Sequence, residues 1–276
     1  MNTVPFSVLL SLYHAEKPEY LRACLHSLAI QTLPVAETVV VFDGMISPEL
    51  ADTVNAFQAA LNIKIVRLPE NVGLGLALQE GIKHCTHEWI CRMDTDDIAV
   101  PQRFAVQAAY WQRNPDIAVL GGQIAEFDTL PENAQNSRCV PHTHHDIALY
   151  ARKRNPINHM TVAFKKSAVL AAGNYRHAPL YEDYDLWVRM LQNGCQFANL
   201  PETLVYARAG DAMYQRRGGW AYACREIKMQ WWFYRSGFLT AWQMGQNLAL
   251  RLPVRLLPQS LRAWVYRHLL RQKQVG

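Results

Sequence analysis

Three carboxylates, Asp94, Asp96 and Asp97, lie within four residues, directly after the short apolar run at residues 89–91. Carboxylates this close repel one another, so a fold that gathers them needs a cation nearby. Mg²⁺ and Mn²⁺ prefer carboxylate and phosphate oxygens, which makes a divalent ion with a nucleoside diphosphate the natural ligand. The alternative is a solvated acidic turn at the end of a strand.

A second acidic pair, Glu182-Asp183, comes just before the apolar segment 186–191. Carboxylates are among the side chains that can act as general bases. The same pair would also stabilise the dipole of a helix that begins there, and the two roles are compatible. His159, inside the segment NPINHMT, is a further candidate, either for ligand binding or for a structural role. The histidines at residues 142–145 are expected to lie in a solvated loop.

The elements that must position these groups can be inferred from the apolar runs. Runs that suit strands buried on both faces lie at residues 6–13, 38–42, 63–68 and 89–93. Segments with helical spacing separate them, and Pro18 stands where the first helix would begin, as Pro48 does for the second. Strand alternating with helix predicts an α/β fold with a mostly parallel sheet.

Ligands bind at the carboxyl ends of the strands in such a sheet. The residues at those ends are Tyr13, Asp43-Gly44, Asn71 and Asp94–Asp97, so we expect them to line one edge. The glycines of NVGLGLALQEG, Gly73 and Gly75, favour a tight loop that enters a helix and lies against a nucleotide. They do not indicate a dinucleotide-binding fold, because Leu78 replaces the third glycine and the loop follows the third strand.

Composition narrows the class of protein. With 276 residues, half of them hydrophobic and 18% charged, the chain is globular, with one large domain or two small ones. No segment has about 18 uninterrupted apolar residues, so no membrane span is expected. The N-terminus lacks the basic region of a signal peptide, and the six cysteines form no CxxC pair, which fits a reducing cytoplasm.

Charge is distributed unevenly along the chain. Residues 201–276 contain 12 Lys and Arg against 3 acids, whereas residues 1–200 contain 16 against 20. A basic tail on a mildly acidic body indicates a phosphate-rich partner, such as a nucleotide, a nucleic acid or a membrane surface. The mixture of Leu, aromatic residues and Arg after residue 220 suits helices that lie on an anionic membrane surface. Alternatively, these helices pack onto the domain and expose their arginines.

The motifs in their order resemble family 2 glycosyltransferases of the GT-A fold. The likeness is strongest to the bacterial enzymes that build capsule, exopolysaccharide and lipopolysaccharide glycans, and it covers roughly residues 5–210. It rests on FSVLLSLY (6–13), VVVFDG (39–44), ENVGLGLAL (70–78), CRMDTDDIAVPQRF (91–104), NPINHMTVAFKKS (155–167) and LYEDYDLWVRMLQNG (180–194).

This resemblance implies a UDP-sugar donor. Asp43 would bind the uracil, although an Asp-Gly turn that merely ends a strand explains it too. Tyr13 and Glu16 would flank the nucleotide, with packing as the alternative for Tyr13, and the loop of Asn71 and Gly73 would lie against the donor.

The family's DxD motif matches Asp94 and Asp96. Asp94 would lie on the ribose side, and Asp96, together with Asp97, would bind Mn²⁺ or Mg²⁺. Arg103 would be a phosphate contact or, as we favour, a charge on a helix surface.

By the same resemblance, Asp183 is the catalytic base of an inverting transfer, and Glu182 orients the base or the acceptor. His159 would lie near the donor phosphates or the acceptor. At least one of Arg208, Arg216 and Arg217 would contact the pyrophosphate from a mobile loop.

The expected organisation is a three-layer GT-A catalytic domain at residues 1–212 and a basic helical extension at residues 213–276. The acceptor would be a hydroxyl of a glycan, and a lipid-linked glycan is expected. The enzyme would lie in the cytoplasm, peripheral on the inner membrane, and no nucleic acid is expected as a partner.

Two other functions are weaker. A nucleotidyltransferase would need a basic glycine-rich loop after the first strand, where the chain has HAEKPEY. A non-catalytic module that binds phosphate or membranes fits the basic tail, but it gains nothing from Asp94, Asp96, Asp97 and Asp183.

Overall fold

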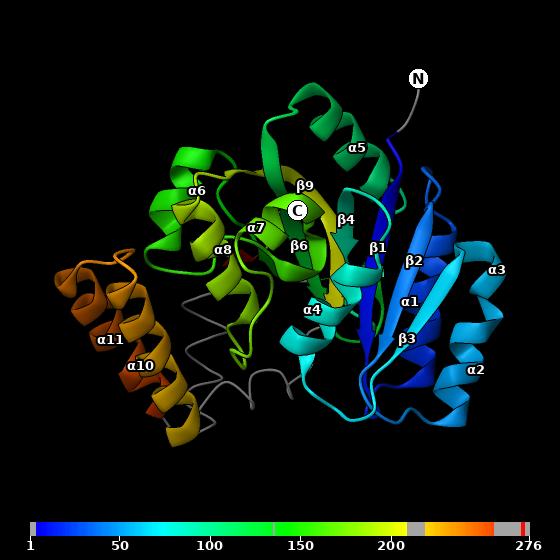
Figure 1. Ribbon diagram of the computed structural model, residues 1–276, viewed down its shortest axis with the longest axis horizontal. Coiled ribbons are helices and arrows are strands. Elements are labelled where there is room, and N and C mark those ends of the chain that lie inside the picture. The colour runs from blue at the N-terminus through cyan, green and yellow to red at the C-terminus, as the bar shows by residue number, and fades with distance from the viewer. Residues whose placement is uncertain (1–3, 135, 209–218, 257–271, 274–276) are drawn as a thin grey trace.

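The computed structural model describes residues 4–134, 136–208, 219–256 and 272–273. Figure 1 shows a twisted sheet with helices on both of its faces. The described strands are β1 (Phe6–Leu12), β2 (Glu37–Phe42), β3 (Ile63–Arg67), β4 (Trp89–Arg92), β5 (Ile98–Ala99), β6 (Ile117–Phe127), β7 (Asn136–Arg138), β8 (Ala163–Lys165), β9 (Gln196–Arg208) and β10 (Gln272–Lys273). The α-helices are α1 (Pro18–Ala29), α2 (Pro48–Ala56), α3 (Gln58–Leu61), α4 (Leu74–His84), α5 (Arg103–Arg113), α6 (His144–Ala151), α7 (Lys166–Ala171), α8 (Glu182–Gln192), α10 (Trp220–Arg235) and α11 (Ala241–Leu256), and the 3-10 turns are η1 (Pro131–Asn133) and η2 (His159–Thr161).

The N-terminal half is the parallel α/β unit that the apolar runs predict. β1 lies between β2 and β4 and is parallel to both, and β3 is parallel to β2. The sheet continues through β8, which is antiparallel to β4 and β6, and through β9, which is parallel to β6. The α/β class is therefore confirmed, with a parallel first half and a mixed second half.

Two apolar layers cover the two faces of the sheet, because successive side chains of a strand point to opposite faces. Val8 and Leu10 of β1 pack with residues of α1, α2 and α5. Leu9, between them, packs with residues of α4, α7 and α8. These contacts give the three-layer arrangement expected of the fold.

Helix starts follow the local signals. Pro18 and Pro48 occupy the first turns of α1 and α2, as predicted. The helix that begins at Pro48 is interrupted at Phe57, which divides it into α2 and α3. The loop expected at residues 142–145 holds for His142, which is exposed, but not for His144 and His145: Thr143 caps α6, its hydroxyl accepting from the Asp146 backbone N–H at 3.3 Å, and the helix begins at His144.

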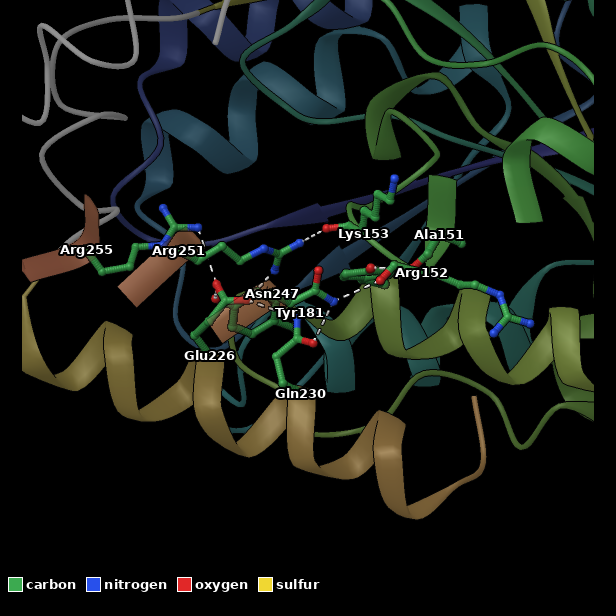
Figure 2. Close-up of polar contacts among 10 residues, drawn as sticks. Ala151, Arg152, Lys153, Tyr181, Glu226, Gln230, Asn247, Arg251 and Arg255 are labelled. Carbon is green, nitrogen blue, oxygen red and sulfur yellow. Dashed lines mark hydrogen bonds and ion pairs between the residues drawn. The ribbon is translucent and has the colours of Figure 1, made fainter. Parts of the chain in front are cut away.

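The helices α10 and α11 form a hairpin beyond α8, at the end of the molecule away from β3 (Figure 1). Phe233 of α10 is fully buried in a small core with Tyr184 and Val188 of α8. The expectation that helices here pack on the domain and expose their arginines holds only in part, because Arg251 and Arg255 turn toward the buried Glu226 (Figure 2). Within the described ranges, no helix has the length and apolar character needed to cross a membrane.

Candidate active site

The strand ends meet at one edge, as the parallel topology requires. Glu16, in the loop after β1, accepts a hydrogen bond from the Thr95 hydroxyl in the loop after β4, at 2.5 Å. Asp94 is joined to α1 through its carbonyl, which accepts from the Cys24 thiol at 3.2 Å. Tyr13 is exposed beside this edge, with its ring against His14. The first and fourth strand ends therefore form one continuous surface.

Asp43 ties the second strand end to the third. Its carboxylate accepts from the backbone N–H groups of Val72 at 2.7 Å and Gly73 at 3.1 Å, and Asn71 donates to its carbonyl at 3.2 Å. Gly44 follows with φ of +86°, and a side chain there would meet the Asn71 backbone nitrogen at 2.7 Å. Asp43 therefore has the role at the end of a strand that the sequence left open. Its hydrogen bonds also bring Asp43, Asn71 and Gly73 together.

The DxD residues are held at different depths. Asp94 receives a two-pronged ion pair from Arg92, with one N–O distance of 2.6 Å. Asp97 is 2% exposed, and its carboxylate accepts from the Arg208 backbone N–H at 2.8 Å. Asp96 is half-buried and has no ion pair within the described residues. A simple solvated acidic turn is therefore the wrong description of this cluster.

Buried negative charge accumulates here. Burial, and then the charges of Asp94 and Glu16, raise the pKa of Asp96 to about 7. Burial, and then the charges of Asp96 and Asp94, raise the pKa of Asp97 well above its ordinary range. Both shifts indicate that the cluster lacks positive charge, which is what a bound cation would supply.

The donor set fits a divalent ion that a diphosphate helps to hold. No group of three or more His, Cys, Asp and Glu side chains in the described part of the chain encloses a metal alone. Mg²⁺-type ions are commonly held by one or two carboxylates with phosphate oxygens completing the shell. Asp96 and Asp97 would be the protein ligands in such a site.

The acidic pair stands at the first residues of α8. Asn155 donates to the carboxylate of Asp183 at 2.5 Å, and the backbone N–H of Tyr184 donates to its other oxygen at 2.8 Å. Burial raises the pKa of Asp183, while these hydrogen bonds and the charges of Arg138 and Arg92 oppose the rise. The carboxylate is thus oriented and kept available as a proton acceptor.

Glu182 packs where α8 approaches α4. A side chain at Gly75 would meet its Cβ at 3.0 Å and the carbonyl oxygen of Arg176 at 2.7 Å, so glycine is required for this approach. The Glu182 Oε2 atom is buried and has no hydrogen-bond partner in the described residues. Burial, and then the charge of Asp183, raise the pKa of Glu182 to about 7.

His159 lies in an aromatic cluster. Its Nε2 is 2.8 Å from the Tyr175 hydroxyl, and its ring meets the edge of the buried Trp187. Burial and the nearby Arg92 charge lower the pKa of His159 well below its ordinary value, so the ring is neutral. The structure shows a packed, hydrogen-bonded histidine, which matches the structural alternative and leaves ligand contact as a prediction.

Of the three arginines expected near the pyrophosphate, the structure describes Arg208, the last residue of β9. Arg208 lies over the rings of Tyr20 and Phe127, at 3.8 and 4.6 Å, and donates to the Asp96 carbonyl at 3.2 Å. It therefore braces the acidic loop, which gives no geometric support to a pyrophosphate contact. Arg216 and Arg217 lie outside the described residues.

The preferred assignment of Arg103 to a helix surface is wrong. Arg103 is fully buried, and its guanidinium donates to the Arg92 carbonyl at 2.7 Å. Burial lowers the pKa of Arg103 to about 10. The Arg103 side chain thus stabilises the carboxyl end of β4 through the last residue of that strand.

Sequence reasoning missed two residues of the site. Arg92, buried at the end of β4, pairs with Asp94 and lowers the pKa of both Asp96 and Asp183 by its charge. Asn155 orients Asp183. A charged residue in an otherwise apolar strand, and a polar residue before Pro156, were the available signals.

Comparison with known proteins identifies the family of this chain. The model of glycosyl transferase family 2 matches residues 7–170. The chain belongs to glycosyl transferase family 2. It is 45% identical to an uncharacterized glycosyltransferase of Haemophilus influenzae, with 97% of this chain and 99% of that protein covered.

Two named relatives also match over nearly their whole length. The amylovoran biosynthesis glycosyltransferase AmsE of Erwinia amylovora is 39% identical, over 95% of this chain and 97% of that protein. The UDP-Gal:alpha-D-GlcNAc-diphosphoundecaprenol beta-1,3-galactosyltransferase of Escherichia coli is 36% identical, over 98% of each chain. This family member is therefore a glycosyltransferase.

Solved structures confirm the GT-A fold. S. aureus TarS 1-349 in complex with UDP-GlcNAc superposes with a TM-score of 0.66 at 19% identity, covering 91% of this chain and 72% of that one. A second structure, S. aureus TarS, gives a TM-score of 0.63 at 19% identity and covers 91% of this chain and 43% of that one. The mannosyltransferase PcManGT of Pyrobaculum calidifontis, in complex with GDP-Man and Mn2+, gives 0.66 at 16% identity, covering 97% and 76%.

Proposed function

We propose that this glycosyltransferase is inverting and metal-dependent, and that it moves a sugar from a UDP-sugar to a hydroxyl of a lipid-linked glycan during cell-surface polysaccharide synthesis. The proposal rests on two acidic groups that both feel the charge of the buried Arg92. One group, at Asp94–Asp97, is short of positive charge, and the other contains an oriented base, Asp183.

The donor would lie along the carboxyl edge of β1 to β4. Asp43 and the loop of Asn71 and Gly73 would contact the uracil, with Tyr13 and Glu16 beside the nucleotide. Asp94 would face the ribose, while Asp96 and Asp97 would hold Mn²⁺ or Mg²⁺. When bound, that ion would neutralise charge developing on the leaving diphosphate.

Asp183 would accept the proton of the acceptor hydroxyl as that oxygen attacks the anomeric carbon from the face opposite UDP. Glu182 would position the acceptor, and His159 would lie close to the donor phosphates or the acceptor. Pyrophosphate contacts would come from Arg216 or Arg217, since Arg208 is engaged elsewhere.

The names of the relatives support the choice of substrates. The relative from E. coli is named for UDP-Gal and a diphosphoundecaprenol-linked GlcNAc, and TarS was solved with UDP-GlcNAc. A galactosyl or N-acetylhexosaminyl donor and a lipid-diphosphate acceptor are therefore proposed here. Such an acceptor would place the enzyme on the cytoplasmic face of the inner membrane, with residues 1–212 as the catalytic domain and residues 213–276 as its extension.

Two variants test these roles. UDP with Mn²⁺ should raise the melting temperature of the protein, because a ligand that binds only the folded state stabilises it. Asp96→Asn should lose most of this shift. Asp183→Asn should keep it but lose transfer by about a hundredfold or more. The matched control is Asp52→Asn, on the exposed side of α2. Normal transfer by Asp183→Asn would remove Asp183 as the base.

A further inference from the structure

The charges of α11 all point inward. The helix contains two charged side chains, Arg251 and Arg255, and both reach Glu226 of α10. Arg255 lies 3.4 Å from Glu226 Oε2, and Arg251 pairs with the other oxygen of the same carboxylate. Figure 2 shows this network between the two helices, with Tyr181 donating to Glu226 at 2.8 Å. The charged side of α11 is therefore part of the interior.

The opposite side of α11 is apolar and exposed. Trp242 is 74% exposed and Leu250 is 76% exposed. Ala249, Pro253 and Leu256 are exposed as well, and helical spacing places all five on one side, together with the exposed, uncharged Gln246. A helix that faces water has the reverse arrangement, with charge outside and apolar residues inside. α11 thus has its charged side chains toward the interior and large apolar side chains toward the outside.

The neighbouring helix α10 continues this character. Trp220, Ile227 and Trp231 are exposed and recur at intervals of seven and four residues, which aligns them along one stripe. Exposed Lys228 and Arg235 flank this stripe. Tryptophan beside cationic side chains is typical of the boundary between a membrane and water.

Charge complementarity indicates the occupant of this surface. After Glu226 the chain contains eight Lys and Arg residues and no acid, and six of these cations remain when Arg251 and Arg255, which pair with Glu226, are set aside. Anionic lipid headgroups attract such a segment, and an apolar helix face with tryptophans partitions into the layer just below them. An uncharged face of Trp, Leu, Ala and Pro offers few hydrogen-bonding groups to fix the register of a protein partner.

We propose that the outward faces of α10 and α11 insert into the interfacial layer of a bilayer that contains anionic lipids, with Trp242 and Leu250 as the principal inserted side chains. Glu226 makes this possible because it keeps Arg251 and Arg255 away from the apolar face. Attachment then depends chiefly on apolar insertion, in contrast to the electrostatic adsorption that the basic composition suggests. The inference rests on the proposed function only for its purpose, which is to bring the active site to a lipid-linked acceptor.

Vesicle flotation with the full chain tests this inference. The vesicles contain phosphatidylcholine and phosphatidylglycerol, and the variant is Trp242→Ser with Leu250→Ser. Its partition coefficient should fall about tenfold or more, because binding scales with the apolar area inserted. The matched control replaces Leu149 of α6 and Leu170 of α7, two exposed leucines on other elements, by Ser. It should bind as the unmodified chain does, and equal binding by all three proteins would overturn the proposal.

Salt and quenching distinguish insertion from adsorption. At about 1 M salt, where charges are screened beyond about 3 Å, vesicle binding should largely persist. Brominated phosphatidylcholine should quench tryptophan fluorescence less in Trp242→Phe than in the unmodified chain. Complete loss of binding in salt, or equal quenching in both proteins, would refute insertion.

Two further readouts separate this inference from its alternatives. If the double variant changes the sedimentation mass of the protein but not its binding to vesicles, the face is a contact between copies of the chain and the inference fails. Transfer to a water-soluble acceptor should be unchanged in the double variant. If the unmodified chain transfers no sugar but still binds vesicles, the proposed function fails and this inference stands.

Discussion

The hydrogen bond from Asn155 is the largest of the interactions that oppose the rise in the pKa of Asp183, the proposed base. Burial raises the pKa of Asp183 and Asn155 lowers it. A base works only when deprotonated, so activity should fall as the pH drops through this pKa. The proposed chemistry therefore depends also on Asn155, which acts through the proposed base.

Asn155→Ala should move the acid limb of the kcat/KM profile to higher pH by about one pH unit, because a hydrogen bond to a charged group stabilises that form by about 1.5 kcal/mol or more. Asn193→Ala is the matched control, since its side chain bonds only the Ala171 carbonyl at the surface. A uniform loss of rate with an unchanged pH profile would assign Asn155 a purely structural role.

Glu182 should destabilise the fold when it ionises. Its pKa rises from the ordinary 4.5 to about 7, so the folded state holds the proton more tightly than the unfolded state does. Below pH 4.5 both states are protonated and there is no cost. Stability is lost as the pH rises from 4.5 toward 7, and above 7 the loss is about 3 kcal/mol at most.

Glu182→Gln removes this ionisation. The variant should melt at a higher temperature than the unmodified chain at pH 8 and at nearly the same temperature at pH 5, while transfer falls. Glu202→Gln, at an exposed position, is the control and should show no difference at either pH. An advantage of the same size at both pH values would show that ionisation is not its cause.

At the residue scale, the sequence indicated the carboxylates but not the buried arginines, Arg92 and Arg103, that lie behind them. Asp94, Asp96 and Asp183 stand in recognisable motifs. The burial of Arg92 and Arg103 follows from contacts that no spacing reveals, such as the bond from Arg103 to the Arg92 carbonyl. The surface position favoured for Arg103 failed for this reason.

At the element scale, the four parallel strands were predicted to within about two residues, because strands buried on both faces are continuous apolar runs. The pairing of β6 with β9 was not predictable, since it joins segments about eighty residues apart and contains irregular register. The helix at His144 was missed although Thr143 and Asp146 form its cap.

The α10–α11 hairpin supplies a test of element packing. Glu226→Gln would remove the carboxylate that pairs with Arg251 and Arg255, and breaking a buried ion pair from one side costs about 3 kcal/mol. Thermal unfolding should show the loss. Adding Arg251→Met to this variant should restore part of the stability, because one uncompensated charge is removed. A melting temperature unchanged by Glu226→Gln would mean that the network does not hold the hairpin.

At the scale of the whole molecule, the sheet edge, the acidic groups and the hairpin form one arrangement. The parallel half supplies the donor edge, α8 supplies the proposed base, and α8 also carries the core on which α10 packs. The uneven charge of the sequence predicted a separate C-terminal extension, and the structure adds that Arg251 and Arg255 in this segment turn toward Glu226. Packing of α10 on α8 would hold the proposed membrane face in a defined position relative to Asp183.

Transfer from UDP-galactose to a GlcNAc-diphosphate-lipid acceptor, with Mn²⁺ or with EDTA, tests the central claim most directly. We expect UDP and a galactosylated lipid only with the divalent ion, and no product with Asp183→Asn although UDP still raises its melting temperature. Equal product in EDTA, or normal product with Asp183→Asn, would contradict the account.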